Sequence, residues 1–459
     1  MSESNPAAAR LLIIGGSDAG ISAALRIREL DARAAVTVVV ADAFPNFSIC
    51  GIPFLLSGEV ADWRSLAHRS VAEIEARGIE LLLEHRAESI DQRGKSVRVV
   101  SSDGRPREIA YDRLLIATGA VSARPPITGL DIPGVFLLRS MSDGLAVKHH
   151  MEREKPRRAA IIGGGYIGLE MADALTCRGL DVTLMEFAPE VLASLDPDLG
   201  SLVRAELGSR GVRVVTGVAV SGIERVDGGL LVRAAASEAI LADLVLVATG
   251  ARPSVALARS AGVALGTAGA IRVDRTMATG TPDILAAGDC AETWHRLLGR
   301  ADYLPLGTTA HKQGRIAGEN LLGGSREFPG SLGTQVVKVF DLVAARTGLR
   351  DKEATAAGFD PLTVALTTWD HKVYYPGARE LHIRITGDRG AGRLLGAQIV
   401  GHRNSEIAKR IDILAAALFH GMRVEELCDL DLAYTPPLST PWDPVQVAAL
   451  EWCARISSQ

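Results

Sequence analysis

Several features that would direct a chain to a membrane, a metal or a nucleic acid are missing from this sequence. No run of about 20 apolar residues is present, so we expect no membrane-spanning helix, and residues 1–10 lack the apolar stretch of a signal peptide. His and Cys do not cluster at zinc-binding spacing, so no metal site is expected. Aromatic residues are only 4%, and the net charge of −4 comes without a basic block. Both observations argue against a nucleic-acid partner.

Cysteine is also scarce. The chain has 459 residues, which predicts two to four domains. An odd number of widely spaced cysteines favours reduced thiols over a secreted disulfide framework and predicts a cytoplasmic location. The five are Cys50, Cys177, Cys290, Cys428 and Cys453.

One cysteine stands in an unusual segment, residues 46–54. Cys50 has no partner at Cys-x-x-Cys or Cys-x-x-x-x-Cys spacing. Gly51 allows a close approach to the backbone, and Pro53 is expected to set a turn. An isolated cysteine is usually buried and inert. The alternative is a reactive thiol, and the rest of the sequence favours it.

A glycine-rich turn precedes this cysteine. Gly15, Ser17 and Gly20 follow a predicted strand and open a predicted helix, an arrangement that suits a pyrophosphate at a helix N-terminus. Ser17 replaces the middle glycine of G-x-G-x-x-G. Val40 ends the second strand where an acidic residue is expected, and Asp42 lies two residues further on. The predicted elements are a strand at 11–14, a helix reaching about residue 30 and a strand at 36–40.

A second unit of the same kind is complete. Gly163, Gly165 and Gly168 form a full G-x-G-x-x-G between a predicted strand at 159–162 and a predicted helix at 169–178. Glu186 ends the following strand, where a carboxylate accepts from a ribose 2′-hydroxyl and repels a 2′-phosphate. No Lys or Arg lies between Glu186 and Leu202. The sequence therefore predicts NADH in preference to NADPH.

The remaining chain repeats one motif and then changes character. Ala-Thr-Gly ends apolar strands at 117–119 and 248–250, and Gly-Asp ends another at 288–289. After residue 328 the pattern predicts an α+β domain with no nucleotide motif, suited to an interface. Its predicted elements are strands at 334–340, 362–368, 380–386 and 394–400 and a helix at 406–419, which follow a helix at 306–322.

In this order, the motifs resemble the pyridine nucleotide–disulfide oxidoreductases over essentially the whole chain. Because Cys50 has no partner cysteine in its segment, the chain is similar to the members with a single redox cysteine: coenzyme A disulfide reductases, NADH oxidases and peroxidases, and persulfide reductases. The resemblance implies an α/β fold with two Rossmann-like domains and a C-terminal α+β dimerisation domain. The implied domains are an FAD domain at 1–120 and 250–325, an NAD(P)H domain at 121–249 and a dimerisation domain at 326–459.

The resemblance also assigns cofactor residues. For FAD they are Gly15, Ser17, Gly20, Asp42, Thr118, Gly119, Asp289, Thr308, Thr309 and Ala310, with Asp289 on the ribityl chain and 308–310 beside the isoalloxazine. For NADH, with NADPH possible, they are Gly163, Gly165, Gly168 and Glu186. Val40 replaces the family's usual strand-end Glu. Asp18 stands where the oxidases tend to carry a histidine, and it either lies near Cys50 or caps the first helix.

Two tyrosines point to one sub-family. The segments around Tyr374 and Tyr434 resemble the Y-Y-P-G and A-Y-A-P-P segments of coenzyme A disulfide reductases, in which two tyrosines of one subunit reach the cysteine of the other; Tyr375 is the substitute for Tyr374. Two positions depart from that pattern. Trp442 replaces a lysine, and Glu29 interrupts a basic pair beside Arg28 where the family meets coenzyme A phosphates.

The implied function is an FAD-dependent NAD(P)H:disulfide oxidoreductase that acts as a homodimer through the catalytic residues Cys50, Tyr374 and Tyr434. Its substrate would be a low-molecular-weight disulfide such as coenzyme A disulfide, or a persulfide or polysulfide, because the protein supplies one thiol. One alternative is an NADH oxidase or peroxidase that cycles Cys50 through a sulfenic acid. Another is a non-catalytic flavin redox sensor or electron-transfer partner.

Overall fold

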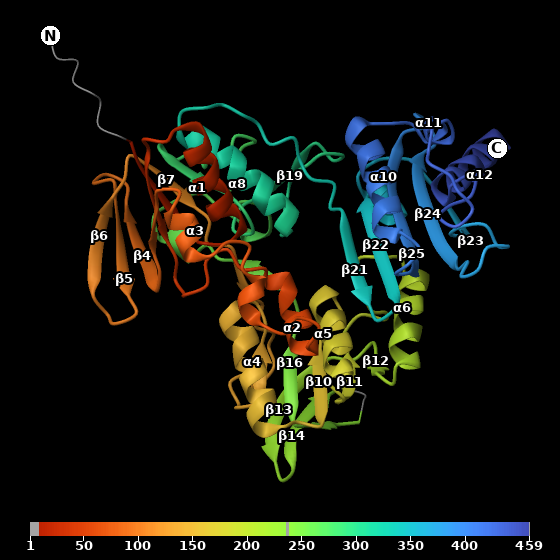
Figure 1. Cartoon of the computed structure of the whole chain (residues 1–459), viewed down its shortest axis with the longest axis horizontal. Coiled ribbons are helices and arrows are strands. Elements are labelled where there is room, and N and C mark those ends of the chain that lie inside the picture. The colour runs from red at the N-terminus through yellow and green to blue at the C-terminus, as the bar shows by residue number, and fades with distance from the viewer. Residues whose placement is uncertain (1–8, 236–237, 459) are drawn as a thin grey trace.

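The computed structural model describes residues 9–235 and 238–458, arranged in three lobes (Figure 1). The first lobe is built on a parallel sheet of order β18-β7-β1-β2-β3. One of its faces packs against α1 and α8, and the other against an antiparallel sheet, β4-β5-β6. The elements are β1 (Arg10–Ile14), α1 (Asp18–Leu30), β2 (Ala35–Val39), β3 (Ile79–Leu82), β4 (His85–Asp91), β5 (Ser96–Ser101), β6 (Pro106–Ala110), β7 (Arg113–Ile116), β18 (Ile284–Ala286) and α8 (Gly307–Leu321).

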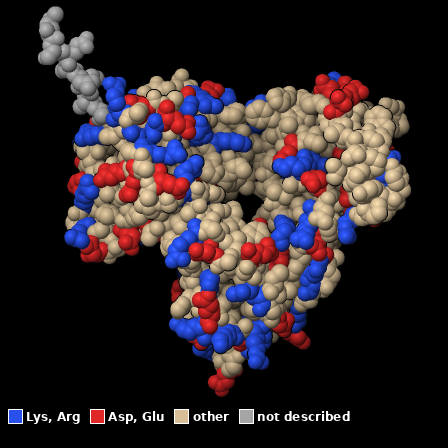
Figure 2. All heavy atoms as spheres, viewed as in Figure 1, with Lys and Arg blue, Asp and Glu red and all other residues tan. Residues whose placement is uncertain are grey.

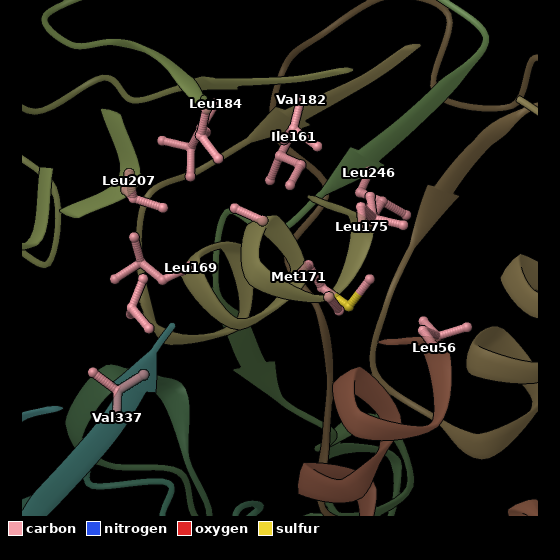
Figure 3. Packing of buried hydrophobic residues seen from close by; sticks show 14 of the residues in the cluster. Leu56, Ile161, Leu169, Met171, Leu175, Val182, Leu184, Leu207, Leu246 and Val337 are labelled. Atoms are coloured by element: carbon pink, nitrogen blue, oxygen red, sulfur yellow. The ribbon is translucent and has the colours of Figure 1, made fainter. Parts of the chain in front are cut away.

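The second lobe repeats this plan with the parallel order β12-β11-β10-β16-β9. Figure 3 shows α5 laid on this sheet, with Leu169, Met171 and Leu175 turned into the apolar core. The helix begins at Tyr166, earlier than predicted. The elements are β9 (Val135–Leu137), α4 (Met141–Glu154), β10 (Arg158–Ile162), α5 (Tyr166–Cys177), β11 (Asp181–Met185), α6 (Pro197–Ser209), β12 (Arg213–Val215), β13 (Val220–Val226), β14 (Gly229–Ala234), β15 (Ile240–Ala242) and β16 (Leu244–Val247).

The third lobe is an antiparallel sheet of order β21-β22-β25-β24-β23 with helices packed against it. The four predicted strands and the long helix are present; β22 and α12 were not predicted. Its elements are β21 (Gln335–Val339), β22 (Leu342–Gly348), α9 (Asp351–Ala356), β23 (Pro361–Trp369), β24 (Glu380–Asp388), β25 (Leu394–His402), α10 (Ile407–His420), α11 (Val424–Cys428) and α12 (Pro444–Ser457). Asp173 on α5 joins this lobe to the second, because it accepts from Lys338 Nζ at 2.9 Å and from the backbone N–H of Phe340 at 2.8 Å.

Short elements complete the chain. The antiparallel pair β8–β17 lies where the chain enters and leaves the second lobe; the domain boundaries near residues 120 and 250 stay a prediction. Among the described residues, no helix is long and apolar enough to cross a membrane. The short elements are η1 (Ile49–Gly51), α2 (Ile52–Ser57), η2 (Trp63–Leu66), α3 (Val71–Glu75), β8 (Ala120–Ser122), β17 (Ala251–Pro253), α7 (Ala256–Ser260), η3 (Thr267–Gly269), β19 (Thr293–His295) and β20 (Arg300–Asp302).

Glycine is required where each nucleotide-type helix leaves its turn. A Cβ added to Gly20 would lie 1.8 Å from the carbonyl oxygen of Gly15, and one added to Gly168 would lie 1.9 Å from that of Gly163. Gly165 is different, because a Cβ there would meet no atom within 4 Å and its φ of −81° suits any residue. The tight turn therefore depends on Gly168, while Gly165 leaves open space in front of the helix.

These two glycines give a matched test of the turn. Gly168→Ala should destabilise the protein by about 1–3 kcal/mol through overpacking, whereas Gly165→Ala should stay within roughly 0.5 kcal/mol in the absence of NADH. Thermal unfolding without nucleotide measures both. Equal melting temperatures for the two variants would contradict the steric argument.

Candidate functional site

Cys50 lies in η1, directly before α2, and is solvent-accessible and unpaired. Pro53 occupies the first turn of α2, where its fixed φ suits a helix, so it starts a helix and does not form the predicted turn. Asn46 anchors the segment, because its backbone N–H donates to the Gly16 carbonyl at 2.7 Å and its carbonyl accepts from the His68 N–H at 2.9 Å. The cysteine loop is thus tied to the first glycine-rich turn.

The surroundings of Cys50 favour its neutral form in the chain alone. Although the residue is accessible, desolvation of its thiol by the surrounding protein atoms raises the pKa; the carboxylates of Glu170 and Asp18 raise it further, and Arg139 lowers it. Glu170 comes from α5 and lines a narrow space against α2, where burial raises its own pKa to about 7. A reactive thiolate at neutral pH therefore needs additional positive potential.

Asp18 lies close enough to Cys50 to affect its ionisation and makes no helix cap, so the first of its two predicted positions fits. Its carboxylate is 3.4 Å from His311 Nε2, while His311 Nδ1 is 2.8 Å from the Ser22 hydroxyl. Ser17, not Asp18, occupies the N-cap position. Burial raises the pKa of Asp18, whereas His311 and His68 lower it. The Asp18 carboxylate therefore interacts both with the Cys50 thiol and with His311 of α8.

A cavity of about 430 Å³ opens next to this group, between α1 and α8. Asn46 lines it, and the Asn46 Oδ1 atom is buried without a hydrogen-bond partner among the described residues. Glu29 is paired with Arg315 at 3.1 Å, while Arg28 turns away to the carbonyls of Arg77 and Ala34 and does not line the cavity. The lining residues are Ile21, Ser22, Leu25, Glu29, Asn46, His68, Arg69, His311 and Arg315.

The first glycine-rich turn fits the pyrophosphate end of FAD. Gly15 has φ +122°, and its missing side chain would lie 2.0 Å from the carbonyl oxygen of Ala117. Ser17 is exposed at the helix start and makes no capping hydrogen bond there. Val40 packs against Gly16, and the Asp42 carboxylate accepts from the backbone N–H of Phe44 at 2.9 Å. Asp42 remains a proposed ribose ligand, with one oxygen already engaged in the turn.

The other proposed FAD residues converge on the C-terminal edge of the same sheet. Asp289 follows β18 and forms an ion pair with Arg139, while its backbone carbonyl accepts from the Tyr303 hydroxyl at 2.9 Å. The residue before it, Gly288, donates its N–H to buried Gln313 at 2.9 Å. Asp289 is therefore rigidly placed, with Arg139 available to an anionic group nearby.

Five further candidates lie near this edge and differ in exposure. Thr118 is half-buried and donates to the Ser254 carbonyl at 2.6 Å, and Gly119 has φ +67°. At the start of α8, Thr308 is exposed, whereas Thr309 and Ala310 are buried. Of the segment 308–310, Thr308 thus presents its side chain to the surface and the other two pack inside.

The second turn fits a dinucleotide with an acidic ribose contact. Gly163 has φ +112°, and Gly165 is exposed at the N-terminus of α5. Glu186 follows β11 and accepts from the backbone N–H groups of Gly164 and Ala188. These bonds fix the carboxylate beside the glycine-rich loop, as a ribose ligand requires. The preference for NADH stays a prediction.

Tyr374 and Tyr434 lie together on the third lobe, although their segments are far apart in sequence. The two residues are 74% and 45% exposed, and the pKa of Tyr374 is raised, first by slight desolvation and then by the neighbouring Tyr434. Buried Arg410 joins the two segments by donating to the carbonyl of Asp370 at 2.8 Å and to the carboxylate of Asp443 at 3.2 Å. Figure 1 shows this lobe on the opposite side of the molecule from α1, with α2 and α5 between them.

Sequence reasoning missed several residues of the site. His68, His311 and Arg315 carry no motif, and only the packing of α8 on α1 brings the last two to the cavity. Glu170 gave a usable signal, since it is a glutamate within the otherwise apolar start of a nucleotide-type helix.

Asp18→Asn tests the electrostatics around Cys50. Removing this carboxylate should lower the pKa of the thiol, because a negative charge beside a thiolate disfavours it. The alkylation rate of Cys50 against pH, followed by mass spectrometry on the holoenzyme, should shift to lower pH. Asp42→Asn is the control, since Asp42 is not among the groups that perturb Cys50. A shift to higher pH in Asp18→Asn would overturn the assignment.

The chain is similar to known proteins along nearly its full length. Residues 9–314 match the family described as pyridine nucleotide-disulphide oxidoreductase, and residues 334–444 match the dimerisation domain of that family. An NADH oxidase of Methanocaldococcus jannaschii is 34% identical over 98% of this chain and 100% of its own. An NAD(P)H coenzyme A polysulfide/persulfide reductase of Pyrococcus horikoshii is 37% identical over 96% and 97% of the two chains.

A solved structure of similar sequence has the same fold. The NAD-dependent persulfide reductase of A. fulgidus superimposes with a TM-score of 0.94 at 38% identity, covering 98% of this chain and 84% of that one. Enzymes of this family use FAD and NAD(P)H, and the two glycine-rich turns described above fit those cofactors. The predicted fold class, of two Rossmann-like domains and a dimerisation domain, is confirmed. The chain belongs to the pyridine nucleotide-disulphide oxidoreductase family.

Proposed function

We propose that this enzyme reduces a disulfide or persulfide of a small thiol that carries anionic groups, such as coenzyme A, with Cys50 as its redox thiol. It acts as a cytoplasmic homodimer with FAD and prefers NADH. One observation carries the proposal: the cavity of about 430 Å³ beside the cysteine loop, into which two arginines and two histidines face.

The cavity suits an organic anion. Its volume lies in the range of small-molecule sites, and Arg69, Arg315, His68 and His311 provide hydrogen-bond donors for phosphate or carboxylate oxygens. Reduction of oxygen or a peroxide needs no such cavity, so the oxidase alternative leaves it unexplained.

The residues around Cys50 have different roles in the proposed thiol–disulfide exchange. When bound, FAD carries two electrons from NADH to the sulfur chemistry. The Cys50 thiolate attacks the substrate sulfur, one thiol leaves, and a mixed disulfide remains on Cys50. Arg139 is the group that favours this thiolate, and Asp18 and Glu170 oppose it. The leaving thiolate needs a donor, which we assign to Tyr374 and Tyr434.

Cys50→Ser tests the proposed function. Bleaching of the flavin by NADH should persist, because the hydride step uses no protein sulfur, while reduction of coenzyme A disulfide should fall to background. Cys177→Ser, which removes another exposed thiol, should keep full turnover. Stopped-flow absorbance and a thiol-release assay measure the two steps. Disulfide reduction by Cys50→Ser would refute the mechanism, and strong turnover of the wild type with oxygen alone would favour an NADH oxidase.

Charge changes in the cavity test the substrate class. Arg315→Gln should raise the KM for coenzyme A disulfide about tenfold or more, because a charge-assisted hydrogen bond is lost. Glu29→Gln should lower it, since this carboxylate pairs with Arg315 and repels phosphate. Neutral hydroxyethyl disulfide is the control, and its KM should change little in either variant. Equal effects on both substrates would place the anion elsewhere.

The exposed tyrosines support an active site shared between two chains. In Figure 2 one part of the third lobe is uncharged, beside acidic residues at its top and a mixed cluster of charges on its inner side. Among its exposed apolar and aromatic residues are Val373, Tyr374, Tyr375, Tyr434, Leu438 and Trp442. An exposed surface of this kind marks an interaction site, and the dimerisation domain of the family covers residues 334–444. A twofold dimer would bring the tyrosines of one chain to Cys50 of the other.

A heterodimer tests this arrangement. Cys50→Ser and Tyr374→Phe/Tyr434→Phe homodimers should both be nearly inactive, since loss of a positioned acid costs ~10²–10⁴ in rate. A doubly tagged heterodimer of the two chains has one complete site and should recover about half of wild-type turnover. Disulfide-dependent oxidation of NADH is the measurement. A heterodimer as inactive as its parents would show that the tyrosines act within their own chain.

A further inference from the structure

Two cysteines that lie far apart in sequence meet outside the proposed active site. Cys428 ends α11, and Cys453 lies near the end of α12, which packs against α11. The two thiols lie close enough that each changes the ionisation of the other, and neither is in a disulfide. Both are half-buried at the edge of the core of the third lobe. The expectation that all five cysteines are widely spaced therefore holds in sequence but not in space.

A buried side chain of α12 fixes the position of the end of α11. Buried Gln446 on α12 donates its side-chain amide to the carbonyls of Cys428 at 3.1 Å and Leu430 at 2.8 Å. Gln446 and Cys453 are seven residues apart, which is about two helical turns, so they share one face of α12. One face of α12 therefore binds the end of α11 through Gln446 and, two turns further along, carries Cys453.

We propose that Cys428 and Cys453 form a second redox-active pair, which low-molecular-weight disulfides convert reversibly into an intramolecular disulfide. This site uses none of the residues assigned to FAD, NADH or the substrate cavity. It requires only that the chain meet oxidised small thiols, the class of compound that the cavity beside Cys50 fits.

The two thiols have different roles in this reaction. Burial raises the pKa of both, to about 11 for Cys428. The contact between them raises the pKa of Cys428 further and lowers that of Cys453. Cys453 therefore ionises more readily and is the attacking group, because the thiolate is the nucleophile.

The exchange balances in two steps. Cys453, after losing its proton, attacks one sulfur of the small disulfide, so a mixed disulfide forms and one small thiolate leaves and takes up that proton. The Cys428 sulfur then attacks the Cys453 sulfur and displaces the second small thiolate, which takes the proton of Cys428. The protein is oxidised by two electrons, and one small disulfide becomes two thiols.

The bond would close the chain around a functional segment. Residues 429–452 connect the two cysteines and include Tyr434 and Trp442. Arg410 and Lys372 already bind this segment, through the Asp443 carboxylate at 3.2 Å and the Pro436 carbonyl at 3.2 Å. A covalent link at its base would restrict how far the tyrosine segment can move from α10.

Mass spectrometry of the full-length holoenzyme tests the pair. The Cys50→Ser variant, in which the redox thiol cannot interfere, is reduced, desalted and treated with excess oxidised glutathione without oxygen. We expect one peptide pair linked through Cys428 and Cys453, two hydrogens lighter than the reduced pair and restored by dithiothreitol. With Cys428→Ser added, Cys453 should instead retain glutathione as a mixed disulfide.

Exposed Cys177 is the internal control, because it has no cysteine partner in the described structure and should carry glutathione. The linked form should exceed the glutathione adduct on Cys453 by more than about tenfold, since the second step is intramolecular. Free Cys428 and Cys453 thiols beside a modified Cys177, or a separate adduct on each of them, would overturn the proposal.

Discussion

The arrangement of the site depends on one contact, the packing of α8 on α1 with almost no side chain between them. A Cβ added to Gly314 would lie 2.2 Å from the carbonyl oxygen of Ala19, and one added to Gly318 would lie 2.5 Å from that of Ala23. The two helices are therefore held at backbone distance and in a fixed register. That register places His311 beside Asp18 and Ser22, and sets the distance between the walls of the cavity.

The two nucleotide-type turns show how one backbone serves two purposes. Val40 and Glu186 occupy equivalent places, each directly after the second strand of its unit and against the middle of the glycine-rich turn. Val40 closes its turn by apolar packing, whereas Glu186 keeps a carboxylate there, bound to two backbone N–H groups. The first turn therefore has no carboxylate at this place, whereas the second presents one.

Much of the fold followed from the sequence because local patterns determined it. A strand–glycine–helix unit can be recognised in a sequence because only glycine fits at a few crowded positions, such as Gly20 and Gly168. The site was predicted less completely. Tyr374 and Tyr434 were found through local sequence likeness, but their contact depends on buried Arg410, and the facing thiols of Cys428 and Cys453 depend on how α11 meets α12. Such pairs arise from tertiary packing, and periodicity within one element cannot reveal them. Strand β22 was missed because it lies between a predicted strand and a polar segment without a clear alternating pattern.

The contact between α1 and α8 also has a consequence for biosynthesis. The two helices stand at opposite ends of the first lobe's sequence, with the entire second lobe inserted between them. At translation rates of about 5–20 residues per second, α1 must wait on the order of half a minute for α8 to leave the ribosome. During that time the face of α1 that carries Ala19 and Ala23 is not covered by α8, whereas the whole sequence of the second lobe has already been made. Cotranslational folding should thus begin in the middle of the chain, and the flavin site should be among the last parts to form.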